Sequence, residues 1–291
     1  MTVLFILGAT ACQNDELQSS EDLNSLTPMD AYVDASGLKS TISQLAITSE
    51  FLDEINEGLA MDGQNYRAVM AEYMTAAGSG ELGQTVWAKN VGNKQLGADL
   101  VPNDPRGWWN DPLGDANIIT YAIDQTGDAV PFFGGLTAAE TTAAIVSATD
   151  TWDDVKYSDL GLLYLPTTPV QDLGYAGGAP DIFADIKHAG WGFILGSGVL
   201  GVTITFIWVN AGVPTDIDNN GKSDVAFREI YYAFDFTWTN DEDPGINVEI
   251  VAVHELGHGL SQAHFGKVFT KKNGDLKVLP RAVMNALYTG P

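Results

Sequence analysis

The spacing of apolar residues divides the chain into a helical N-terminal part and a mixed α/β remainder. From Leu38 to Met74, apolar residues recur at helical spacing, which predicts two or three helices. The small-residue stretch Ala76–Gly83 then indicates a boundary. Beyond it, the pattern predicts a helix from Thr137 to Val155, opened by a capping box, and strands over residues 118–123, 160–165, 181–186, 202–209 and 225–232. This order favours an α/β (α+β) fold with helices packed on a sheet.

The charge and cysteine content exclude several classes of function. The 291 residues contain 14 Lys and Arg against 38 Asp and Glu, so the net charge is −24. Such a chain repels phosphate backbones, and we expect no nucleic-acid partner. An acidic membrane surface would not attract it by charge either. The single cysteine excludes an internal disulfide and thiolate-rich metal sites.

The first residues resemble a bacterial export signal. Met1–Ala11 is an apolar run too short to span a bilayer as a helix, and it ends in the small residues Ala9-Thr10-Ala11. Cys12 and a polar stretch follow, as in lipoprotein signals, where the cysteine carries the lipid, although Ala9 replaces the usual Leu. The positively charged leading segment of such signals is missing, which suggests a natural start further upstream. We expect an exported protein that is held on the cell surface or outer membrane through lipid on Cys12. The alternative is that the protein is simply secreted.

The scarce histidines are concentrated in one short window. Three of the four lie in His254-Glu255-Leu-Gly-His258-Gly-Leu-Ser-Gln-Ala-His264. On a helix, His254 and His258 project from one face and can share a metal, while Glu255 can reach a metal-bound water as a general base. His264 follows six residues later, about 600° of helical rotation, so the chain must leave the helix to bring it round as a third ligand. Three histidines with one open position are typical of a catalytic zinc site.

This motif, HELGHGLSQAH, resembles the HExxHxxGxxH signature of the metzincin metalloproteases, with Ser261 where the family has Gly. The family's Gly is left-handed at the helix end, where a serine costs roughly 1 kcal/mol. Downstream, Met284 and Tyr288 resemble the Met-turn of the matrixin branch, with a Met beneath the zinc and a Tyr lining the substrate pocket. The resemblance covers roughly residues 115–291. It implies a catalytic domain with a twisted mixed sheet, a long helix and an active-site helix.

The resemblance also implies how substrate would bind. The strand Val199–Phe206 would lie at the edge of the sheet and pair with an extended protein or peptide substrate, since exposed strand edges bind peptides by adding a strand. We therefore expect a monomeric zinc endopeptidase in which Glu255 is the general base. Two alternatives remain open: a non-catalytic, metal-stabilised surface binding module, and a zinc hydrolase acting on something other than protein.

A second metal site is predicted from an acidic loop. Asp216, Asp218, Asn220 and Asp224 offer oxygen ligands at positions one, three, five and nine of a calcium-type loop, with Gly221 at position six. Position twelve is Phe227, so the closing carboxylate would be Asp224 or Glu229. The alternative is a solvated acidic turn. Only His188 remains for the second, structural zinc of matrixins, so we expect that zinc to be absent and His188 to be a surface or packing residue.

These predictions divide the chain into three parts. Residues 1–12 form the signal segment, and residues 13–80 form a tether and a small helical region that is a candidate propeptide. Residues 81–291 form the metzincin-like catalytic domain.

Overall fold

The computed structural model describes residues 47–76, 84–89, 97–102, 104–107, 118–126, 130–131, 133–155, 158, 160–174, 183–192, 194, 198–240 and 245–262. Cys12, His264, Met284 and Tyr288 lie outside this part, so the predictions for them stay predictions. No helix in the described ranges is long and apolar enough to cross a membrane.

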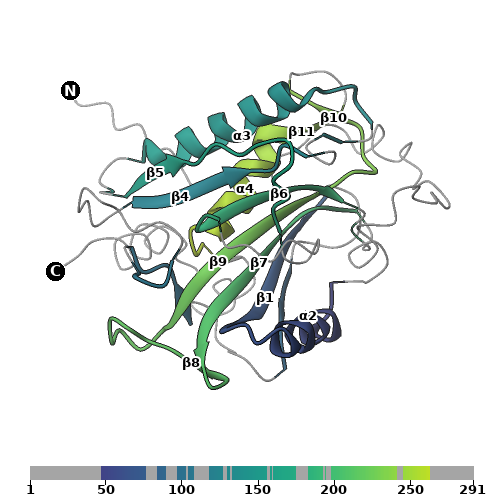
Figure 1. The fold of residues 1–291 in the computed structure, drawn as a ribbon. Helices are drawn as coiled ribbons and strands as arrows, with labels where there is room; N and C mark the ends of the chain where they lie inside the picture. Colours follow the sequence, from purple (N-terminus) through teal and green to yellow (C-terminus); the bar gives the residue numbers. More distant parts are fainter. Residues whose placement is uncertain are drawn as a thin grey trace, which may run out of the picture.

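A mixed sheet forms the centre of the molecule (Figure 1). Its main strands run in the order β2-β1-β7-β9-β6-β4-β5. Neighbours from β9 to β5 are parallel, whereas β7 is antiparallel to both β9 and β1, and β1 is antiparallel to β2. The bounds are β1 (Tyr66–Thr75), β2 (Gln84–Trp87), β3 (Ala98–Asp99), β4 (Ile118–Ile123), β5 (Gly161–Tyr164), β6 (Ile186–Gly192), β7 (Val199–Asn210), β8 (Val213–Pro214) and β9 (Ser223–Ala233). Two short strands, β10 (Trp238–Thr239) and β11 (Ile246–Asn247), pair separately.

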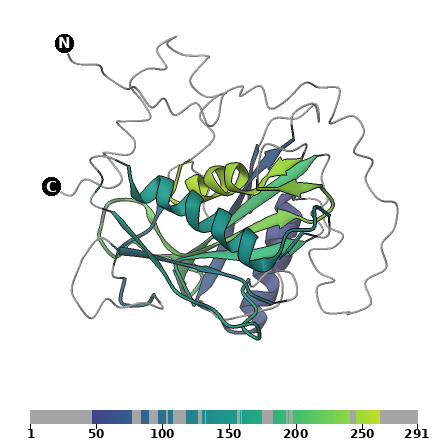
Figure 2. The same ribbon diagram turned by 90° about the horizontal axis from the view of Figure 1, so that it is seen from above.

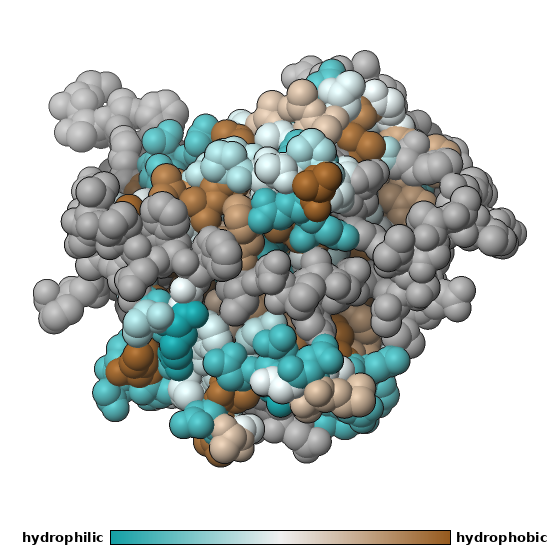
Figure 3. Space-filling view, viewed as in Figure 1, coloured by the Kyte–Doolittle hydropathy of each residue, from teal (hydrophilic) through white to brown (hydrophobic). Residues whose placement is uncertain are grey.

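Helices cover both faces of the sheet. The helices α3 (Ala138–Asp153) and α4 (Val248–Gly259) lie side by side on one face, and α2 (Ser49–Met61) lies on the other (Figures 1 and 2). Each face has its own core: Ile145 and Leu256 belong to the α3–α4 side, and Leu52 and Leu59 belong to the α2 side. Hydrophilic residues gather in the lower part of Figure 3, over α2 and the β8 hairpin. The fold is therefore mixed α/β, as the sequence predicted, and the structure adds that helices form a layer on each face of the sheet.

Several elements are confirmed at or near their predicted positions. Strand β4 has the predicted bounds, and β9 extends its prediction by a few residues. Helix α3 opens with the predicted capping box: Thr137 Oγ1 accepts from the Glu140 N–H, and Glu140 Oε2 accepts from the Thr137 N–H at 2.8 Å. Reciprocal bonds of this kind satisfy N–H groups that have no partner inside the helix.

The helical prediction for residues 38–74 is only partly right over residues 47–74, and residues 38–46 lie outside the described part of the chain. Residues 49–61 do form a helix, capped by the Thr48 side chain, but Val69, Met70 and Tyr73 lie in strand β1. This strand is buried on both faces, so it lacks the alternation that marks a half-buried strand. The predicted boundary near residue 80 falls between β1 and β2, which pair in the same sheet.

The strand predicted over residues 181–186 is wrong in its described part, because residues 183–185 lie outside any strand and β6 begins at Ile186; residues 181 and 182 lie outside the described residues. Its buried positions include the polar residues Lys187 and His188, which hide it from a search for apolar runs. Lys187 is neutralised by Glu229 on the neighbouring strand, with Nζ to Oε1 at 2.9 Å. The Asp185 carboxylate, just before the strand, instead accepts from the N–H and hydroxyl of Thr120.

The substrate-binding edge predicted at Val199–Phe206 is also wrong for this structure. These residues form most of β7, which is paired with β9 on one side and with β1 on the other. Both of its hydrogen-bonding edges are therefore occupied, and in this state it cannot accept an added strand.

Candidate metal centre

Helix α4 carries the histidine motif against the sheet and against α3. The Asn247 side chain caps its first turn by accepting from the Ile250 N–H at 3.1 Å. The helix packs closely on α3: Trp152 Nε1 donates to the Val253 carbonyl at 2.8 Å. A Cβ on Gly257 would lie only 2.9 Å from the Trp152 ring, so this contact requires the glycine of the motif.

The two motif histidines converge as predicted. The Nε2 atoms of His254 and His258 lie 3.2 Å apart. Two zinc–nitrogen bonds of about 2.0–2.1 Å at a tetrahedral angle would separate their nitrogens by roughly 3.4 Å, so the pair fits zinc. His258 Nδ1 lies 2.6 Å from the Gln262 carbonyl oxygen, which can only accept. Nδ1 is therefore the protonated nitrogen, and the Nε2 lone pair is left for a metal.

Burial also keeps His258 neutral. The pKa of His258 is lowered to about 4, chiefly by burial, with the Gln262 carbonyl opposing this and the charge of Arg228 adding to it. A neutral imidazole at pH 7 is the form that binds a metal ion.

Glu255 lies fully buried beneath β7. Its Oε2 is 2.7 Å from the hydroxyl of Thr203, and that hydroxyl is also 3.0 Å from the Glu255 backbone carbonyl. Its Oε1 has no hydrogen-bond partner in the described part of the chain. Gly201 makes room for the side chain, since a Cβ there would come within 2.9 Å of Glu255 Cγ. Burial raises the pKa of Glu255 to about 8, against a lowering by Thr203, so in the metal-free chain this carboxyl is largely protonated at neutral pH.

A second buried carboxyl, that of Glu72 on β1, lies beside the motif. Glu72 Oε1 is 3.6 Å from His258 Nδ1, and it accepts a hydrogen bond from Thr85 on β2. Burial raises the pKa of Glu72 to about 8, although the charge of Arg228 opposes the rise. Glu72 was not among the residues predicted from the sequence, because nothing local to it signals that β1 pairs with a strand some 130 residues later.

Arg228 on β9 holds the end of the motif helix. Its guanidinium donates to the Gly259 carbonyl at 2.7 Å and to Ser261 Oγ at 2.8 Å, and its Nε donates to Thr205. Ser261 has φ 66°, the left-handed conformation expected where the family has Gly. The chain thus leaves the helix after Gly259, as it must if His264 is to approach the same metal.

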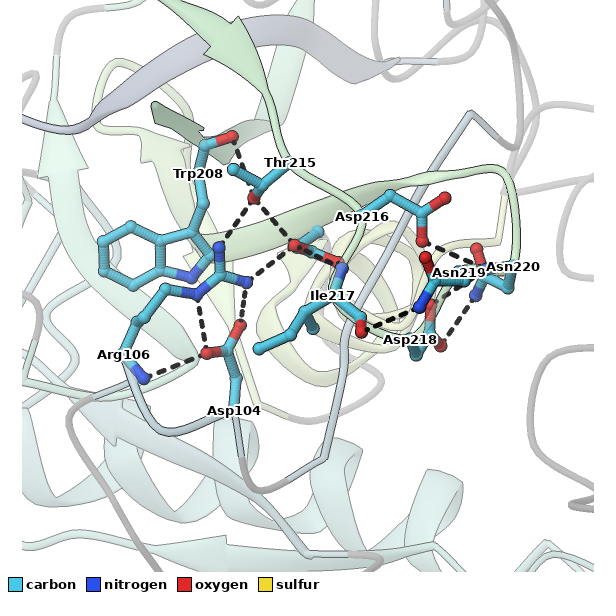
Figure 4. A network of polar contacts seen from close by, with 10 residues as sticks. Asp104, Arg106, Trp208, Thr215, Asp216, Ile217, Asp218, Asn219 and Asn220 are labelled. Atoms are coloured by element: carbon cyan, nitrogen blue, oxygen red, sulfur yellow. Dashed lines mark hydrogen bonds and ion pairs between the residues drawn. The ribbon is translucent and has the colours of Figure 1, made fainter. Parts of the chain in front are cut away.

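The acidic loop after β8 brings the predicted oxygen ligands together (Figure 4). Ligand atoms of Asp216, Asp218 and Asp224 lie within 4.8 Å of one another, and Asn220 bonds Asp218 within the loop. Asp224, however, is buried and ion-paired with Arg106 at 2.6 Å. Arg106 also pairs with Asp104 and lies over the Trp208 ring. The loop therefore offers mainly Asp216 and Asp218 to a cation, since an arginine already compensates Asp224. Glu229, the other closing carboxylate considered, pairs with Lys187 instead.

His188 is a packing residue, one of its two predicted roles. It is 1% exposed and stacks on Tyr232, whose hydroxyl lies 2.8 Å from Nδ1. Burial lowers the pKa of His188 to about 3.

No protein-family model matches the chain, and no curated protein matches it.

Proposed function

We propose that this protein is a zinc-dependent endopeptidase related to the metzincins, in which His254, His258 and His264 hold one zinc ion. The observation that carries the proposal is the convergence of the two Nε2 atoms, 3.2 Å apart, on the helix that also carries the buried Glu255. The long helix α3 and the motif helix α4 on one face of a mixed sheet support the same relationship. The third ligand, His264, is supported by the sequence alone. The same holds for the expected export of the chain and for the lipid on Cys12.

Each residue of the centre has a part in the proposed reaction. Zinc bound there would lower the pKa of a water and polarise the carbonyl of the scissile peptide bond. Glu255 takes the proton of the attacking water and passes it to the leaving amine. In the metal-free chain burial favours the protonated form of Glu255, and a cation bound nearby would favour the carboxylate that a general base needs. Thr203 fixes the Glu255 carboxyl, and the Gln262 carbonyl fixes the ring of His258.

Replacing the general base tests this function. Glu255→Ala should keep one zinc per chain, measured by elemental analysis, but lose cleavage of casein or gelatin. Glu249→Gln is a matched control, because Glu249 lies in the first turn of α4 and accepts a hydrogen bond from Ser147 at 2.9 Å. Cleavage by the Glu255→Ala variant at the parent rate would rule out this mechanism.

The two alternative functions predict other outcomes. A surface binding module would bind zinc and cleave nothing in a peptide library under any activation condition. A hydrolase of another class would spare peptides but lose its own reaction in the Glu255→Ala variant.

We also propose that calcium binds the loop of Asp216 and Asp218. The loop already turns sharply, with left-handed Asn219 and Gly221. Calcium should raise the melting temperature of the parent but not of an Asp216→Asn/Asp218→Asn variant. An equal rise in both would show that the loop is only a solvated turn.

A further inference from the structure

A cavity of about 610 Å³ lies where β1 begins and β7 ends. Its lining comes from the turn between α2 and β1, from Arg106, and from the end of β7 with the β8 hairpin. Asn210 on its wall is seven residues along β7 from Thr203, which is roughly 23 Å at the rise of about 3.3 Å per strand residue. The cavity is therefore separate from the candidate metal centre, and its volume is within the range of about 300–1,000 Å³ typical of small-molecule sites.

The charged residues of this lining are both arginines. Arg67 and Arg106 line the cavity, and no Asp or Glu of the described part of the chain does so. This is unusual for a protein with 38 acidic residues against 14 Lys and Arg. A cavity whose only charged lining groups are guanidiniums favours an anionic ligand.

The guanidinium of Arg67 is anchored on one side only. Its Nη1 donates to the Gln64 carbonyl at 2.7 Å and to the Tyr66 carbonyl at 2.6 Å, which uses both hydrogens of that nitrogen. Its Nε and Nη2 have no protein partner among the described residues, and the side chain is only partly buried. These two nitrogens form the planar fork that binds a carboxylate through two parallel hydrogen bonds. The backbone thus holds Arg67 in place and leaves its fork for a ligand.

Arg106 has a different role, because its donors are largely used within the protein. Its Nε and Nη2 bond the carboxylate of Asp104, and Nη2 also pairs with Asp224 at 2.6 Å (Figure 4). Its Nη1 donates to Thr215 at 2.6 Å. Two carboxylates therefore compensate the charge of Arg106, which supports the wall, whereas Arg67 is the cation that a ligand can pair with.

Amide side chains complete the polar part of the lining. Gln64, Asn65 and Asn210 all line the cavity. Each carboxamide offers two donors and an acceptor, which suits the hydroxyl groups of a ligand. An anion of the size of acetate would leave most of the volume unfilled. The lining therefore fits a carboxylate carried by a larger molecule that is rich in hydroxyl groups.

We propose that this cavity is a binding site for a small hydroxyl-rich carboxylate, of the sugar-acid class, whose carboxylate is held by Nε and Nη2 of Arg67. The carboxamides of Gln64, Asn65 and Asn210 bind its hydroxyl groups. This site does not depend on the endopeptidase function proposed above, and its test needs no catalysis.

Isothermal titration calorimetry of the full chain with glucuronate tests the ligand class. Glucuronate should bind. Glucose lacks the carboxylate, and inorganic phosphate lacks both the planar anion and the hydroxyl-bearing body, so each should bind at least about tenfold more weakly. No binding of glucuronate at millimolar concentrations, or equal binding of glucose, overturns the proposal. Phosphate bound as tightly as glucuronate overturns the sugar-acid assignment.

Three substitutions that each change the net charge by −1 locate the site. Arg67→Gln removes the fork, and Asn210→Asp places a like charge on the wall, so both should weaken glucuronate binding at least about tenfold. Lys89→Gln is the matched control, because Lys89 is exposed, pairs with Glu50 and lies outside the lining. It should bind glucuronate within twofold of the parent.

Two further comparisons separate recognition from folding. Arg67→Lys keeps the charge but not the fork, and it should also lose at least about tenfold in affinity. Thermal unfolding verifies that the variants are folded. Asn210 is exposed, and its substitution leaves the backbone anchors of Arg67 intact, so Asn210→Asp tests the cavity even where an Arg67 variant fails to fold. Parent-like affinity in Asn210→Asp, or an equal loss in Lys89→Gln, overturns the proposed site.

Discussion

The guanidinium of Arg228 donates a hydrogen bond to Oγ of Ser261, 2.8 Å away, at the point where the motif helix ends. Arg228 is fully buried, and it also donates to Thr205 Oγ1 and to the Gly259 carbonyl. Ser261 is left-handed, which strains a residue that has a Cβ. Serine at this position is therefore more strained than glycine would be, but its hydroxyl accepts a hydrogen bond from the buried guanidinium of Arg228.

Two substitutions at Ser261 separate these effects. Ser261→Gly relieves about 1 kcal/mol of strain but removes a hydrogen bond to a charged group, which contributes about 1.5–3 kcal/mol. We expect Ser261→Gly to lower the free energy of unfolding by about 1 kcal/mol. Ser261→Ala keeps the strain and loses the hydrogen bond, so it should be about 1 kcal/mol less stable than the Ser261→Gly variant. Urea unfolding measures both. A Ser261→Gly variant more stable than the parent would show that Arg228 does not depend on this bond.

The two glycines of the motif helix should respond oppositely to alanine. A Cβ on Gly257 would lie 2.9 Å from the Trp152 ring, which its own hydrogen bond to Val253 holds in place. Gly257→Ala should therefore destabilise the α3–α4 contact by about 1–3 kcal/mol, as overpacking does. A Cβ on Gly259 meets side-chain atoms no closer than 3.4 Å. Gly259→Ala should be neutral or stabilising by up to about 1 kcal/mol, because alanine favours the helix. Thermal unfolding of the two variants checks the contrast, and equal losses would contradict it.

Local signals predicted the parts of the fold that depend on neighbouring residues. The Thr137–Glu140 capping box and the apolar strand β4 are examples. Strand β1 could not be predicted this way. It is covered by α2 on one face and by α4 on the other, so its apolar residues do not alternate, and Val69, Met70 and Tyr73 match helical spacing by coincidence. Strand β6 was misplaced because Lys187 becomes compatible with burial only through Glu229, a partner distant in sequence.

In the candidate site, too, local sequence signals predicted some residues, whereas others depend on contacts between distant segments. His254, Glu255 and His258 follow from spacing on one helix, and the structure brings the two histidines together. The residues around them, Glu72, Thr203 and Arg228, come from β1, β7 and β9. Their roles depend on strand pairing, which no local pattern encodes. The same pairing overturned the predicted edge position of β7.

Glu72 should make the stability of the metal-free chain depend on pH. Its pKa is about 8 in the folded chain against an ordinary value of 4.5, so the folded state holds a proton that the unfolded state has released between these values. Stability from this group is complete below pH 4.5 and is lost as the pH rises towards 8. The side chain introduced by Glu72→Gln cannot ionise. The free energy of unfolding of this variant minus that of the parent should therefore be larger at pH 8.5 than at pH 5, by at least about 1 kcal/mol, since one pKa unit corresponds to about 1.4 kcal/mol.

Urea unfolding of the metal-free proteins at the two pH values measures the difference for Glu72. Glu57→Gln, on the exposed side of α2, is the control and should show no such difference. A Glu72→Gln variant that follows the parent at both pH values would mean that Glu72 is not buried in solution.

Thr203 should act as a positioning residue for Glu255, provided that the proposed reaction is correct. Its hydroxyl lies 2.7 Å from Glu255 Oε2, and the side chain is fully buried. Thr203→Val keeps the shape and removes the hydroxyl. A hydrogen bond to a charged group contributes about 1.5–3 kcal/mol, so kcat should fall roughly 10- to 100-fold if that bond orients the base in the transition state. Zinc content and KM should change little, because Thr203 lies on β7 and not among the predicted zinc ligands. Thr203→Ser retains the hydroxyl and should recover most of kcat. A loss confined to KM, or an equal loss in both variants, would show that Thr203 supports the strand and does not orient Glu255.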